Sequence, residues 1–229
     1  SDIMYLLNTG WIILFADSPQ MVYDFNLIAL KLAEWVNLPV AVAFDGFFTS
    51  HQKQKCYVFE DDSTVQDFIG EKHATYSVLD LSHPISIGSY MNEPDVINNR
   101  YQLSLAMDEA KKALPKLFNT YSQLSGRKHE TVSGYCHEDA DILLFLIGSS
   151  YHTACVAVDQ LRAKGIKAGV VTLHVLRPFP AEELRHFCCH AKVILAADRQ
   201  DSYGAGGGNM SLELRAALQE NTASGHPIR

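Results

Sequence analysis

Residues 11–51 read WIILFADSPQMVYDFNLIALKLAEWVNLPVAVAFDGFFTSH, in which two apolar runs flank a periodic segment. The run 11–16 predicts a buried strand. Asp17-Ser18-Pro19 then provides a helix cap and a proline at the first helical position. Apolar residues at 22, 25, 28, 29, 32 and 35 recur with helical spacing, and residues 40–44 predict a second strand. A strand, a helix and a strand in this order form the parallel βαβ unit of an α/β protein.

Polar residues follow the second predicted strand directly, in the segment DGFFTSH at 45–51. Ligands of open α/β sheets bind at the carboxyl ends of the strands, so this segment is a candidate site. Its acid, serine and histidine also suggest a hydrolase. However, Ser50 and His51 are adjacent and no GxSxG elbow is present, which argues against a catalytic triad.

The middle of the chain is less regular. Residues 53–59 predict a short strand and 63–69 a short acidic helix. Residues 71–94 are polar and rich in turn formers, and such long irregular connections are usually functional or partner-facing. Residues 95–124 predict a long helix that is interrupted or kinked near Pro115.

The second half alternates strands with helices. We expect strands at 141–147, 168–175 and 192–197, and helices at 151–164, 181–190 and 210–220. This order predicts a doubly wound α/β domain. We therefore divide the chain into a first domain at 1–127, a linker at 128–138 and a second domain at 139–229.

Composition limits the classes of function. The chain has 229 residues, of which 47% are hydrophobic and 20% charged, as in an ordinary globular protein. A net charge of −7 gives no basic surface for nucleic acid or for an acidic membrane. The chain has five cysteines, an odd number, and no two of them have CxxC spacing. This pattern argues against a disulfide framework and favours the cytoplasm. It also argues against an iron–sulfur cluster or a structural zinc site.

Three further segments each have a chemical and a structural interpretation. Residues 204–209 could bind a phosphate at a helix N-terminus, or could be a turn that lets the last helix pack closely. Gly148-Ser149-Ser150 could bind an anion, although we favour helix capping. His186 and His190 have the i,i+4 spacing of metal ligands but no acidic partner, so we expect no metal site there.

A series of segments resembles the 2-oxoacid:ferredoxin oxidoreductases, and the chain is similar to their alpha subunit without its N-terminal part. The segments occur in the family's order: Gly10-Trp11-Ile12, Leu38-Pro39-Val40, Phe44 to His51, Ser125-Gly126-Arg127, Ile147-Gly148-Ser149, Leu176 to Pro180 and Asp198-Arg199. The resemblance implies a fold in two parts. The first would be the C-terminal part of a pyrimidine-type thiamine-diphosphate-binding domain, and the second a domain like the C-terminal domain of transketolase.

The resemblance also implies an activity. Such enzymes decarboxylate a 2-oxoacid, pyruvate first among them, and transfer the acyl group to coenzyme A and electrons to ferredoxin or flavodoxin. Thiamine diphosphate with Mg²⁺ and the iron–sulfur clusters would be held mainly by other subunits or domains, and none by this chain alone. The implied partners are those subunits and the electron carrier, with no nucleic acid or membrane.

Two groups of residues match the family's motifs. One group would shape the wall of the active site or a subunit interface, and the other would be structural or interfacial: Asp45, Gly46, Phe47, Ser50 and His51 in the first, and Arg177, Asp198 and Arg199 in the second. No residue is assigned a catalytic or metal-binding role, because the family's catalytic residues precede this segment. We therefore expect a fragment that is inactive alone.

Two alternatives remain. The chain could be a non-catalytic docking or scaffold subunit of such a complex. It could also be an unrelated nucleotide-binding module that uses residues 204–209.

Overall fold

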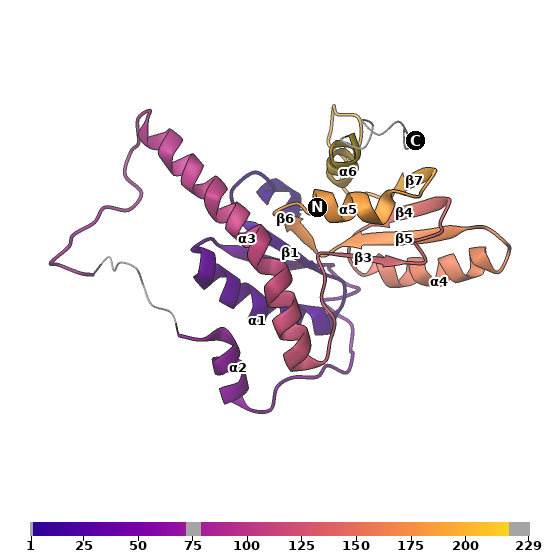
Figure 1. Cartoon of the computed structure of the whole chain (residues 1–229), viewed down its shortest axis with the longest axis horizontal. Helices are drawn as coiled ribbons and strands as arrows, with labels where there is room; N and C mark the ends of the chain where they lie inside the picture. The colour runs from indigo at the N-terminus through magenta and orange to yellow at the C-terminus, as the bar shows by residue number, and fades with distance from the viewer. Residues whose placement is uncertain (1, 72–78, 220–229) are drawn as a thin grey trace.

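Two sheets organise the chain in the computed structural model, which describes residues 2–71 and 79–219 (Figure 1). The first sheet has the strand order β2-β1-β6, and the second has the order β3-β5-β4-β7. A short 3₁₀ turn, η1 (Asp2–Leu6), precedes them. Within the described ranges, every helix is too short or too polar to cross a bilayer.

The predicted βαβ unit is confirmed. Strands β1 (Ile12–Ala16) and β2 (Val40–Phe44) are parallel, and Ile12 lies opposite Val40. Helix α1 (Pro19–Val36) connects them, and Ser18 caps it by accepting a hydrogen bond from Met21 N. All five residues of β1 are buried, as the apolar run indicates.

Strand β6 (Val175–Arg177) was not expected, and it pairs antiparallel with β1. The strand expected at 168–175 is therefore divided. Its first part forms β5 (Ala168–Leu173) in the second sheet, and the chain then crosses to the first sheet. At the crossing, Phe15 N donates to His174 O at 2.9 Å. The two sheets are thus joined through the main chain.

The second sheet is mainly parallel. Strand β4 (Ile142–Leu146) lies between β5 and β7 (Val193–Ala196), parallel to both. The three helices expected in this half of the chain are present: α4 (Ser150–Arg162), α5 (Ala181–Cys188) and α6 (Asn209–Gln219). The linker at 128–138, for which the sequence predicts no strand, contains β3 (Val132–Tyr135), which pairs antiparallel with β5.

The strand predicted at 53–59 is absent, and that prediction was wrong. A side chain takes the place of a partner strand: Gln20 accepts from Tyr57 N at 2.6 Å and donates to Tyr57 O at 3.0 Å. Helix α2 (Asp62–Ile69) follows as predicted. Helix α3 (Asp95–Ser125) is continuous through Pro115, so the expected interruption does not occur.

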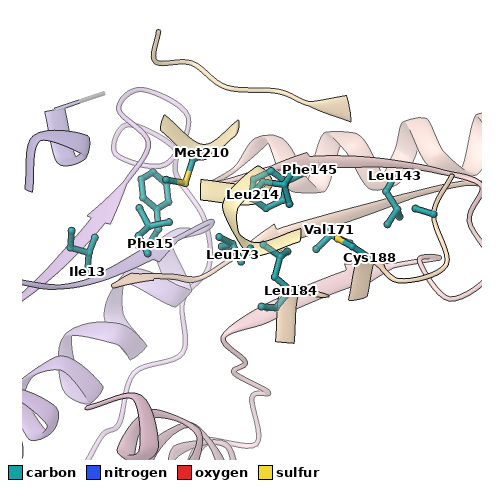
Figure 2. Packing of buried hydrophobic residues seen from close by; sticks show 14 of the residues in the cluster. Ile13, Phe15, Leu143, Phe145, Val171, Leu173, Leu184, Cys188, Met210 and Leu214 are labelled. Carbon is teal, nitrogen blue, oxygen red and sulfur yellow. The ribbon is translucent and has the colours of Figure 1, made fainter. Parts of the chain in front are cut away.

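Among the described residues, the core has one cluster shared by both sheets, another under the long helix, and a smaller one between α4 and the second sheet. In the shared cluster, Phe15 of β1 packs with Phe145, Leu173 and other residues of the second sheet (Figure 2). In the second, the C-terminal half of α3 covers α1. The N-terminal half of α3 projects from the body of the molecule (Figure 1). Burial of apolar surface in these clusters fixes the relative position of the two sheets.

Candidate functional site

A cleft of about 710 Å³ lies where strands of both sheets end. Phe44 ends β2, Leu146 ends β4, and Ala197 follows β7; all three line the cleft. In the second sheet the chain runs from β4 to β5 on one side and returns to β7 on the other. Such a switch in strand order is where doubly wound sheets bind ligands.

Asp45 lies in this cleft, directly after β2. Its Oδ2 accepts a hydrogen bond from Ser149 N at 2.5 Å, and its Oδ1 lies 3.5 Å from Nη1 of Arg199. A carboxylate at a helix N-terminus satisfies a free N–H group and stabilises the helix dipole. Ser149 itself makes no side-chain capping bond, so the predicted serine cap is wrong and Asp45 caps α4 instead.

Gly148 makes this contact possible. Its φ is +79°, and a Cβ there would lie 2.3 Å from Asp45 Oδ2 and 2.9 Å from the Phe15 ring. Only glycine allows both the left-handed backbone and the close approach. The glycine and the aspartate therefore act as one structural unit.

Among the other residues of the DGFFTSH segment, one lines the cleft and several are exposed on the surface. Gly46 lines the cleft with Asp45. Phe47, by contrast, is 79% exposed, and its ring stacks on His51 with centroids 5.4 Å apart. Ser50 Oγ accepts from Phe47 N at 2.9 Å and lies 2.7 Å from His51 Nδ1. Phe47, Ser50 and His51 thus form an exposed turn outside the cleft.

Arg177 makes contacts within the chain. Its Nε donates to Leu7 O at 2.8 Å, and its Nη2 donates to Glu213 at 2.5 Å. These bonds tie β6 to the segment before β1 and to α6. A structural role fits this geometry.

Asp198 caps α6. Its Oδ2 accepts from Met210 N at 2.7 Å and from Ser211 N at 3.3 Å. A Cβ on Gly208 would lie 2.3 Å from the same oxygen. Because this carboxylate occupies the position where a phosphate would bind, the geometry favours the structural interpretation of residues 204–209. Arg199 follows at the rim of the cleft, with its side chain 74% exposed.

A second, smaller cleft of about 420 Å³ contains an acid–histidine pair that sequence analysis missed. Asp17 follows β1 and is 6% exposed, and its Oδ2 lies 3.5 Å from His152 Nε2. Burial alone would raise the pKa of Asp17, but the hydrogen bond from His152 and the charges of His174 and His152 lower it. The hydrogen bond to Asp17 raises the pKa of His152 against the opposing effect of burial. Asp17 directly follows a strand, and this position could have marked it as a candidate site residue. In the sequence, however, it stands in the Asp17-Ser18-Pro19 segment that predicts a helix cap.

A buried carboxylate elsewhere has a structural role. Asp24 of α1 is 0% exposed and accepts from Arg127 Nε at 2.8 Å, Arg127 Nη2 at 2.6 Å and Tyr121 Oη at 2.8 Å. Nε2 of His129 lies 3.0 Å away. Burial would raise the pKa of Asp24, but bonds from His129, Arg127 and Tyr121 hold it well below its usual range. The network joins α1, α3 and the segment before β3, which accounts for Arg127 in the SGR motif.

The described residues do not fit the metals of the expected cofactors. Within residues 2–71 and 79–219, no group of three histidine, cysteine or acidic side chains converges on one point. The five cysteines are unpaired. Mg²⁺ needs several oxygen ligands and an iron–sulfur cluster needs several thiolates, so we assign no step of catalysis to these groups.

Two relatives illustrate what the chain is similar to. Pyruvate synthase subunit PorA of Thermotoga maritima is 36% identical over 207 residues, which cover 90% of this chain and 53% of that protein. Ketoisovalerate oxidoreductase subunit VorA of Pyrococcus abyssi is 33% identical over 224 residues, covering 97% of this chain and 56% of the relative. The chain thus spans about half the length of the curated relatives it matches.

A solved structure shares the fold. A chain of 2-oxoglutarate:ferredoxin oxidoreductase from Magnetococcus marinus, solved with 2-oxoglutarate, coenzyme A and succinyl-CoA bound, matches with a TM-score of 0.59. The match covers 95% of this chain and 39% of the other, at 14% identity. The predicted α/β class is confirmed.

Family models match both parts of the chain. The model for core domain II of pyruvate:ferredoxin oxidoreductase matches residues 140–228. The thiamine diphosphate-binding model of pyruvate flavodoxin/ferredoxin oxidoreductase matches residues 1–119, more than half of the chain. The resemblance stated from the motifs is therefore confirmed, and the chain belongs to the pyruvate flavodoxin/ferredoxin oxidoreductase family.

Proposed function

We propose that this chain is part of a 2-oxoacid:ferredoxin oxidoreductase. In the proposed reaction, a 2-oxoacid and coenzyme A give acyl-CoA and carbon dioxide, and the electrons pass to ferredoxin or flavodoxin. Pyruvate is the first substrate to test. The observation that carries the proposal is the succession of two family matches, to a thiamine diphosphate-binding part and then to core domain II.

The names of the relatives support the reaction class and leave the substrate open. One is a pyruvate synthase subunit and another a ketoisovalerate oxidoreductase subunit, at similar identity to this chain. Both are named as subunits, which supports a complex with other subunits as partners. A cytoplasmic location, expected from the cysteine usage, belongs to the same proposal.

The proposal also covers which parts of the complex hold the cofactors and which domains this chain contributes. Thiamine diphosphate with Mg²⁺ and the iron–sulfur clusters would be held mainly outside this chain, since no suitable donor set lies among the described residues. The domain at 1–127 would then be the C-terminal part of a thiamine-type domain. The domain at 139–229 would be the transketolase-like one, with the linker at 128–138. The separate family matches to residues 1–119 and 140–228 support this division, although β6 of the second part pairs in the first sheet and β3 of the linker in the second.

Within that complex, we propose that the segment Asp45 to His51 forms part of the active-site wall or of a subunit interface. Support comes from Asp45 and Gly46 in the cleft and from the exposed Phe47 and His51 beside it. His51→Ala, purified as the full complex, tests this role. We expect reduced turnover or weaker subunit association, and a variant that assembles and turns over normally would contradict it.

The reaction itself is tested on the intact complex from its source. We would measure reduction of a low-potential viologen dye, with coenzyme A present, across a panel of 2-oxoacids. Reduction with one acid supports the class and names the substrate. Thiamine diphosphate and iron are assayed in the same preparation, so that loss of cofactor is not mistaken for lack of activity.

One observation favours the alternative of a docking or scaffold subunit. Asp2, Asp45 and Asp198 are the acidic residues among the described residues that line the cleft, and two of them, Asp45 and Asp198, are engaged in capping helices. A preparation that contains thiamine diphosphate and iron but reduces no dye with any 2-oxoacid would favour this alternative.

A further inference from the structure

The larger cleft has the position and the size of a small-molecule site. It lies at the switch in strand order beside the ends of β4 and β7, where doubly wound sheets bind ligands. Its volume of about 710 Å³ is within the range of roughly 300–1,000 Å³ that ligand sites occupy. The end of β2 adds a wall from the first sheet.

The floor of the cleft is apolar. It contains Phe15 of β1, Val42 of β2, Ile147 after β4 and Met210 of α6. Phe15 and Met210 belong to one packed cluster and are drawn next to each other in Figure 2. A thioether beside an aromatic ring forms an adaptable surface for a flat apolar group.

Among the described residues that line the cleft, the charged ones are the acids Asp2, Asp45 and Asp198 and one cation, Arg199. Both oxygens of Asp45 face partners, Ser149 N and Arg199, and both oxygens of Asp198 accept main-chain hydrogen bonds. Arg199, by contrast, is 74% exposed. One of its terminal nitrogens, Nη1, contacts Asp45, at 3.5 Å. The other N–H groups of the guanidinium can therefore donate to a ligand.

We propose that this cleft binds a small organic acid, with a flat apolar body on the floor and one carboxylate or phosphate group paired with Arg199. A guanidinium offers parallel N–H donors that match either anion. The site needs no 2-oxo group and no cofactor, so it does not depend on the proposed reaction.

Calorimetric titration of the full chain, in the complex in which it purifies, tests this site. The probes are 3-phenylpropionate and phenyl phosphate at low ionic strength, where charge pairing is least screened. We expect at least one to bind with Kd on the order of 1 mM. The neutral 3-phenylpropanamide, and acetate or inorganic phosphate without the apolar body, should each bind at least about tenfold more weakly. The stronger of the two acids identifies the anion that the site prefers.

Two variants locate the binding. Arg199→Gln removes the cation, and Ala197→Trp places a large side chain in the cleft from an exposed position and keeps the arginine. Each should weaken binding at least about tenfold. The matched controls Arg100→Gln and Ala157→Trp, at exposed positions of α3 and α4, should leave it unchanged. Absence of binding by both acids, or equal binding by the wild type, Arg199→Gln and Ala197→Trp, would overturn the proposal.

Discussion

Asp45 and Ser149 are 104 positions apart in the sequence, yet Asp45 Oδ2 accepts a hydrogen bond from Ser149 N at 2.5 Å. The end of a strand in the first sheet thereby caps a helix of the second. This contact places the segment after β2 against the N-terminus of α4. At the cleft, a polar contact as well as the shared core therefore holds the two sheets in their relative position.

Substitution of Asp45 should therefore lower the stability of the whole chain. We expect Asp45→Ala to cost about 1–2 kcal/mol, since it leaves the first turn of α4 without its cap. Asp45→Asn keeps an oxygen acceptor and should cost less. Urea unfolding measures both, with Asp201→Ala at an exposed loop position as the control. Equal stabilities for Asp45→Ala and Asp201→Ala would show that the contact contributes nothing.

Gly148 should tolerate no side chain. Gly148→Ala combines a left-handed backbone with a Cβ that would collide with Asp45 and Phe15. Gly165→Ala is a matched control, because its φ is +82° and a Cβ there meets nothing within 4 Å. We expect the control to lose about 1 kcal/mol from the backbone alone, and Gly148→Ala to lose at least about 2 kcal/mol more. Thermal unfolding of the pair checks the difference, and similar losses would contradict the crowding.

The network around Asp24 should be a major source of stability. Arg127→Gln leaves a fully buried carboxylate without its charged partner, which costs about 3–5 kcal/mol. Lys192→Gln breaks an ion pair whose side chains are 74% and 45% exposed, and should cost less than about 1 kcal/mol. Urea unfolding at neutral pH compares the two variants. A loss at Arg127 no larger than that at Lys192 would show that Asp24 is satisfied without the arginine.

The same network predicts the direction of acid sensitivity. The pKa of Asp24 is lower in the folded chain than the ordinary aspartate value of 3.8. Ionised Asp24 therefore contributes to the free energy of unfolding above about pH 4. This contribution is lost as the pH falls through the lowered pKa that Asp24 has in the folded chain. In Arg127→Gln this contribution is already reduced. The stability difference between the wild type and the variant should accordingly shrink below about pH 4, and a constant difference would contradict the linkage.

Local sequence was sufficient for the elements that depend on local interactions. The βαβ unit follows from the periodicity of α1, from Ser18 as its cap and from the apolar run of β1. The candidate site at Asp45 followed from the position of that residue after a strand. Its capping of α4 did not, because a partner 104 positions away leaves no local signal.

Elements that depend on distant partners could not be predicted. Strand β6 exists because β1 offers it a free edge, and β3 because β5 does. The segment 53–59 has strand-like residues, but Gln20 satisfies the backbone of Tyr57 and no strand pairs with it. Asp24 was missed for a similar reason, since a single acid in an amphipathic helix gives no sign that Arg127 will reach it.

The Asp17–His152 pair predicts a second pH effect, of opposite sign. The pKa of His152 is raised in the folded chain, so its pairing with Asp17 stabilises the fold fully below the unfolded value of about 6.5 and is lost as the pH rises through the folded value. The side chain is 60% exposed, and solvent screening limits the effect to about 0.5 kcal/mol. His152→Gln should remove it, while His190→Gln, at an exposed position after α5, should not. Thermal unfolding between about pH 5.5 and about pH 8.5 should show the stability of the wild type exceeding that of His152→Gln most at the acidic end. A difference that grew with pH would mean that His152 stabilises the fold in its neutral form.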